Sequence, residues 1–195
     1  MSFRILVVTE DFRRDQFIAR PVVERMAAEC RPRALVEVCR RPKLGGVRRG
    51  FDEAYLRRAV LPLYPMFDVI VLLLDRDGVG GRERSLVDLA ERLTTPSQRV
   101  LGAAAIEELE IFVLAGHPHA RNWDWQAMRR DADVKNTHFR RLVAETGCSK
   151  LPFEGRASLM AEALRHWSRI KTLCPEDIGS LLAQLRRAAS TGAGA

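Results

Sequence analysis

Acidic residues follow two predicted strands of this chain, at positions where they could hold a metal ion. Glu10 follows the apolar stretch FRILVVT, and Asp75 and Asp77 end the stretch VIVLLLDRDG. Three carboxylates in one crevice repel each other and raise each other's pKa unless a cation neutralises them. Carboxylate oxygens are ligands that Mg²⁺ and Mn²⁺ prefer. The pattern predicts a Mg²⁺ (or Mn²⁺) site at Glu10, Asp75 and Asp77. The alternative is that these acids only cap the helices that follow the strands.

Alternating strands and helices must position these acids. Short apolar runs predict strands at 3–9, 34–40, 67–75 and 99–106, and helical spacing predicts helices at 15–30, with Asp15 as N-cap, 52–64 and 82–95. This alternation predicts an α/β fold: a Rossmann-like, mostly parallel four-stranded sheet flanked by helices. Sites in such sheets form at the carboxyl ends of the strands, so the three acids should share one edge.

The chain after residue 105 has a mainly helical pattern. Helices are expected at 106–116, 123–131, 135–146, 156–173 and 175–188. Their apolar faces need a partner surface. We therefore expect an α/β domain at 1–118 and a C-terminal helical extension at 119–190 that packs on the same globule.

Composition and charge narrow the class of protein. The chain has 195 residues, is 47% hydrophobic and carries a net charge of +7, which favours a nucleic-acid partner. No apolar run approaches the roughly 20 residues that span a bilayer, so no membrane association is expected. The four cysteines are scattered and no export signal is visible, which predicts a cytoplasmic protein without a disulfide framework.

Together, these acids resemble the motif of the Toprim domain found in topoisomerases, primases and OLD-family nucleases. That family has a glutamate after its first strand and D-x-D after its third, here Glu10 and Asp75–Asp77. Glu107 and Glu110 of AIEELEIFVLAG are candidates for a further acid, with Glu110 favoured. This segment, DADVK and CPEDIGSLLAQL resemble the stand-alone Toprim-like proteins of domain-of-unknown-function family 4276. The resemblance implies that Glu10, Asp75, Asp77 and Glu110 are metal ligands and catalytic residues.

The same resemblance implies a metal-dependent nuclease with a separately encoded ATPase and a role in phage defence. DNA is favoured over RNA, although the residues do not separate the two, and the oligomeric state stays open, a homodimer included. The family's usual glycine after the first glutamate is Asp11 here, and its aspartate in WLLAD is Gly116. These departures keep open an alternative: a non-catalytic Toprim-like nucleic-acid-binding or regulatory subunit.

Basic residues could hold the phosphate backbone without reading sequence. The loop KLGGVRRG lacks the spacing of a P-loop, so it is interpreted as an ordinary basic loop. The candidates for nucleic-acid contacts are Lys43, Arg48, Arg49, Arg76, Lys150 and Arg156.

Overall fold

The computed structural model describes residues 3–191 and contains one four-stranded sheet. Its strands are β1 (Arg4–Val8), β2 (Leu35–Val38), β3 (Val69–Asp75) and β4 (Arg99–Ala105), in the order β2-β1-β3-β4. All neighbouring strands pair in parallel. The predicted α/β class, with a parallel sheet flanked by helices and helices after it, is confirmed.

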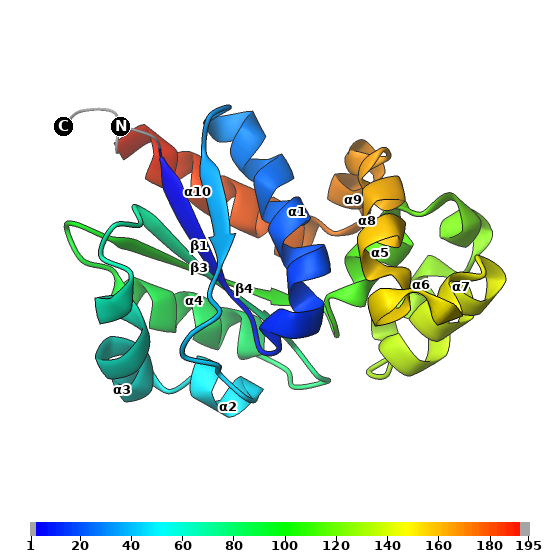
Figure 1. Ribbon diagram of the computed structural model, residues 1–195, viewed down its shortest axis with the longest axis horizontal. Helices are drawn as coiled ribbons and strands as arrows, with labels where there is room; N and C mark the ends of the chain where they lie inside the picture. Colours follow the sequence, from blue (N-terminus) through cyan, green and yellow to red (C-terminus); the bar gives the residue numbers. More distant parts are fainter. Residues whose placement is uncertain (1–2, 192–195) are drawn as a thin grey trace.

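Helices cover both faces of the sheet (Figure 1). One face is covered by α1 (Phe12–Cys30) and α10 (Ser180–Thr191), and the other by α4 (Arg82–Leu93). The short helices α2 (Val47–Gly50) and α3 (Glu53–Tyr55) lie between β2 and β3, and α3 continues into one π-helical turn, Leu56–Val60. Successive residues of β3 alternate between the two cores, because strand side chains point to opposite faces.

The first helix begins earlier than its apolar spacing predicted. Its N-cap is Asp11, whose side chain accepts a hydrogen bond from Arg13 N, rather than Asp15. The Asp15 carboxylate instead accepts from Asp11 N at 2.8 Å. Asp11 therefore has a structural use at the position where the Toprim pattern carries glycine.

The region after β4 is built from short helices: α5 (Glu110–Gly116), α6 (Trp125–Arg130), α7 (Arg140–Glu145), α8 (Arg156–Leu164) and α9 (Trp167–Leu173). The helix predicted at 156–173 is divided into α8 and α9. α8 packs on both α5 and α1, and one hydrophobic cluster runs from the sheet through α5 to α10. The domain boundary near residue 118 stays a prediction.

At Gly116, α5 lies close to the backbone of α8. A Cβ atom at this position would lie 2.4 Å from the backbone oxygen of Ala163. The site that is aspartate in the Toprim-like pattern therefore has no room here even for a methyl group. Gly116 is a packing residue in this chain.

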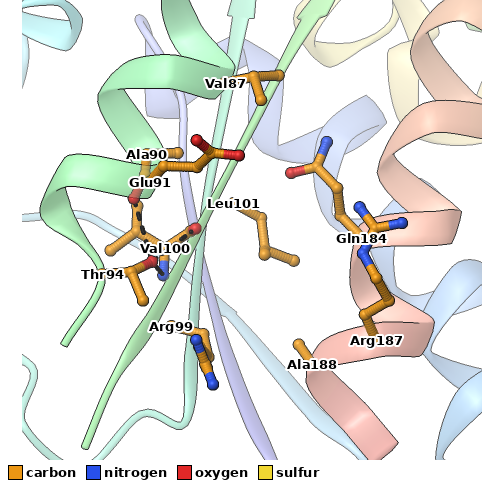
Figure 2. Close-up of a pocket in the computed structure, with 10 residues that line it drawn as sticks. All are labelled: Val87, Ala90, Glu91, Thr94, Arg99, Val100, Leu101, Gln184, Arg187 and Ala188. Carbon is orange, nitrogen blue, oxygen red and sulfur yellow. Dashed lines mark hydrogen bonds between the residues drawn. The ribbon is translucent and has the colours of Figure 1, made fainter. Parts of the chain in front are cut away.

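Side chains occupy the outer edge of β4. Gln184 bonds both Gly102 N and Gly102 O, at 3.3 and 3.0 Å, while the Thr94 hydroxyl lies 3.0 Å from Val100 N. Figure 2 shows Thr94 and Gln184 on opposite sides of this strand, around a pocket of about 380 Å³. None of the predicted acidic residues lines this pocket, whose wall comes from α4, β4 and α10.

Candidate acidic site at the switch point of the sheet

The sheet changes its winding direction between β1 and β3. β2 lies on one side of β1, and the chain then crosses to β3 on the other side. Ligand sites of open parallel sheets lie at such a switch point, outside the carboxyl ends of the strands. Glu10 follows β1 there, and Asp75 is the last residue of β3. The fold therefore places the predicted acids where this class of sheet forms its sites.

Asp75 lies at the centre of the acidic cluster. Burial is the largest cause that raises the pKa of Asp75 well above its ordinary value, and the charges of Glu110, Asp15 and Asp77 raise it further. The Leu109 backbone N–H donates to Asp75 Oδ1 at 2.9 Å. One amide only partly offsets the loss of water and the repulsion. This carboxylate would therefore gain from a nearby cation.

Glu10 belongs to the same electrostatic field. Burial, and then the charge of Asp77, raise the pKa of Glu10, while a hydrogen bond from the Val47 backbone lowers it. Asp77 thus acts on both Glu10 and Asp75. Neither Glu10 nor Asp75 forms an ion pair within residues 3–191. Each of the two carboxylates has a backbone hydrogen bond but no ion-pair partner in this part of the chain.

Asp77 is held in an unusual backbone conformation. Its φ is 49°, in the left-handed region that costs a residue with a Cβ roughly 1–2 kcal/mol. Arg82 Nη1 donates to Asp77 Oδ2 at 2.6 Å and to the backbone oxygen of Asp75 at 3.0 Å. The Asp77 side chain is 43% exposed. The Arg82 side chain is only 14% exposed, so the ion pair is partly shielded from solvent and holds Asp77 in place.

Glu107 and Glu110 have different roles in the structure. Glu107 pairs with Arg76 and accepts from Gly78 N at 2.6 Å, which fastens the turn after β3. Glu110 opens α5 and pairs with Arg156 at 2.6 Å, while its charge raises the pKa of Asp75. Of the two candidates, Glu110 is therefore the one that faces the cluster.

Two further acids and a lysine belong to this cluster, and sequence reasoning did not assign them to it. Burial is the main cause that raises the pKa of Asp15 to about 7, and that of Glu108 also to about 7. Glu110 raises the pKa of both, and Lys135 lowers it. Asp15 could have been found because the helix after β1 starts at the same edge as Glu10. Glu108 was hidden in the run EELE.

The donor chemistry fits a hard divalent cation, but the ligands are not arranged as a finished cage. Within residues 3–191, no group of three or more His, Cys, Asp or Glu side chains is placed to hold a metal ion. Two predicted ligands, Asp77 and Glu110, are each paired with an arginine. Coordination of a metal ion through Asp77 Oδ2 would therefore require that oxygen to leave Arg82.

The predicted phosphate contacts divide into two groups. Lys43, Arg48 and Arg49 are exposed in the segment after β2, on the edge of the sheet that bears the acids, and Lys150 is exposed after α7. Arg76, by contrast, is held by Glu83 and Glu107. Arg156 is 1% exposed and bonds Glu110 and Glu154, so its interpretation as a surface phosphate contact is corrected. It is a buried counter-ion for a site residue.

Fold and site together define a parallel α/β protein with an acidic cluster at its switch point. Comparison with models of known families, with curated proteins and with solved structures yields no match. The Toprim resemblance therefore stays a prediction. In the part of the chain between residues 3 and 191, no helix has the length and apolar character needed to cross a bilayer.

Proposed function

We propose that this protein is a divalent-metal-dependent nuclease of the Toprim type that cleaves nucleic-acid phosphodiesters. The observation that carries the proposal is the position of Asp75: a desolvated carboxylate at the switch point, repelled by Glu110, Asp15 and Asp77. Clustered carboxylates with raised pKa values are typical of sites that bind cations or move protons. The exposed basic residues after β2 supply a surface for the phosphate backbone.

Glu10, Asp75 and Asp77 would hold Mg²⁺ or Mn²⁺, with Glu110 as a further acid. When bound, the cation supplies Lewis-acid polarisation of the scissile phosphate. Arg82, once separated from Asp77, would donate to a phosphate oxygen beside the acids. Lys135, whose charge acts on Glu10 and Asp15, adds a second positive group. A separately encoded ATPase partner and a role in phage defence belong to this proposal through the resemblance alone.

The test compares the wild type with Asp75→Asn, which keeps an acceptor for Leu109 N, and with Asp88→Asn, an exposed control acid on α4. Plasmid, linear duplex and single-stranded DNA and RNA are incubated with Mg²⁺, Mn²⁺ or EDTA, and Mg²⁺ and Mn²⁺ binding is measured by calorimetry. We expect cleavage and metal binding in the wild type and Asp88→Asn, and loss of both in Asp75→Asn. Equal cleavage by all three proteins would contradict the proposal.

A non-catalytic nucleic-acid-binding or regulatory subunit is the second candidate. The ion pairs of Asp77 with Arg82 and of Glu110 with Arg156 favour it, because these arginines already neutralise two of the acids. Nucleic-acid binding that is independent of metal, without cleavage by any preparation and without calorimetric metal binding, would support this candidate instead.

A further inference from the structure

A pocket of about 300 Å³ opens beside the acidic site, between α2 and the turn that leads from β3 to α4. Its volume is at the lower end of the range for small-ligand sites, so it suits one compact group. The lining residues are Val47, Arg48, Phe51, Val79, Gly80, Arg82 and Ser85.

The pocket and the acidic site share a wall. Arg82 lines the pocket, donates to Asp77 at 2.6 Å and places its guanidinium 5.7 Å from the centre of the Phe51 ring. Val47 lines the pocket as well, and its backbone hydrogen-bonds Glu10. A ligand in the pocket would therefore lie next to Glu10 and Asp77.

The lining combines an aromatic face with positive charge. Phe51 is half-buried and packs against the core on the α4 face, which fixes its ring, while Val79 is 48% exposed. Arg48 is exposed and forms no ion pair in the part of the chain that is described. Bases stack on aromatic side chains, and guanidinium groups pair with phosphates. A purely apolar ligand would leave the exposed Arg48 guanidinium without an anionic partner.

We propose that this pocket binds one unpaired nucleotide of a single strand, with its base against Phe51 and its phosphate towards Arg48 and Arg82. The proposal builds on the nuclease function, because the bound nucleotide would flank the phosphodiester at the acidic site. A base inside a duplex is stacked and paired, and must be extruded before it can enter such a pocket. The substrate class is therefore single-stranded nucleic acid, or a frayed or unpaired part of a duplex.

Binding in EDTA tests the pocket separately from cleavage. Fluorescence anisotropy with a labelled 12-nucleotide oligothymidine and a duplex of equal length would compare the wild type, Phe51→Ala and Leu63→Ala. Leu63 is a matched control, since it is 56% exposed and lies outside the pocket. We expect Phe51→Ala to weaken single-strand binding about tenfold, with duplex binding unchanged and Leu63→Ala neutral. If Phe51→Ala binds the single strand as tightly as Leu63→Ala does, and its melting temperature is unchanged, the proposal is overturned.

Phe51→Trp supplies a readout that does not depend on truncating a partly buried ring. A base that stacks on the new indole should quench its fluorescence. The background is the change on oligonucleotide binding in the wild type, which already contains Trp123, Trp125 and Trp167, and the quenching in Phe51→Trp should exceed it. Absence of such quenching at saturating oligonucleotide would overturn the assignment of the base to this pocket.

Two comparisons identify the charged contact and the kind of ligand. Arg48→Ala should weaken single-strand binding more than Arg58→Ala, an exposed arginine outside the pocket that removes the same charge. Equal effects would contradict a specific role for Arg48.

The kind of ligand is tested by competition. Free thymidine monophosphate should displace the labelled strand only at a far higher concentration than an unlabelled strand does. Displacement at equal concentrations would show that the pocket prefers a free nucleotide to a strand. Failure of cleavage alone would contradict the nuclease and not the pocket.

Discussion

The Arg156 guanidinium donates from Nη2 to Glu110 Oε1 at 2.6 Å, and both side chains are buried. The same guanidinium bonds the backbone oxygen of Phe153 and the carboxylate of Glu154, whose residues both have positive φ. Arg156 therefore joins an acid of the candidate site to a strained turn before α8.

Arg156→Met should destabilise the protein by about 3–5 kcal/mol, because it leaves the Glu110 carboxylate buried without its counter-ion. Chemical denaturation measures the change in the free energy of unfolding. Adding Glu110→Leu should recover most of the loss, since it removes the stranded charge. A double variant that is less stable than Arg156→Met would contradict this account. Arg165→Met, which removes an exposed ion pair with Glu162, is the control and should change stability by less than about 1 kcal/mol.

The metal-free protein should lose stability as the pH rises from about 4 to about 7. The folded Asp15 has a pKa of about 7 against an ordinary value of 3.8, so between these values the folded state binds more protons than the unfolded state. Stability then falls with rising pH, by at most roughly 4 kcal/mol for this group. Thermal melts in EDTA check the trend. Asp15→Asn should flatten it, and a melting temperature for the wild type that rises steadily across this range would contradict it.

Asp77→Asn should keep the stability of the wild type and lose cleavage. Asparagine tolerates the left-handed region, and its amide oxygen can still accept a hydrogen bond from Arg82 in place of the ion pair. Asp77→Gly should be as stable, or more stable by up to about 1 kcal/mol, since it relieves the strained backbone. Urea denaturation and the cleavage assay are measured in parallel. An active Asp77→Gly variant would show that the strained aspartate has no part in cleavage.

Gly116→Ala should cost about 1–3 kcal/mol, because the new methyl group would press on the backbone of Ala163, which cannot move alone. Gly50→Ala is the comparison. There the new methyl group would meet a terminal carbon of Leu74, which can rotate away, and alanine is favoured in helices. Urea denaturation of both variants should therefore rank Gly116→Ala as the less stable. The reverse order would contradict the close approach of α5 and α8.

The sheet could be predicted from the sequence because each strand is a short apolar run. The segments between the strands have the apolar spacing of helices, and strands connected by helices are typical of a parallel sheet. The sequence could not predict the partners of the acids. Arg82 and Arg156 reach Asp77 and Glu110 through the fold, and Arg156 is 46 residues away from its partner along the chain. The division of the helix predicted at 156–173 was also hidden, because its apolar spacing continues across His166. Asp15 was predicted to be an N-cap, because an acid near the start of a helix gives the same sequence pattern whether it caps the helix or belongs to a site.

The outer edge of β4 limits how copies of this chain can assemble. Three backbone N–H groups on this edge donate hydrogen bonds to side chains. The N–H of Val100 donates to Thr94, that of Gly102 to Gln184, and that of Ile106, just beyond the strand, to Asp177. A strand from a second molecule would have to displace these side chains before it could pair there, so this edge is protected from sheet-to-sheet joining and from strand exchange. A homodimer, if one forms, must therefore use helical surfaces or the β2 edge, and the sheet of each copy should end at β4.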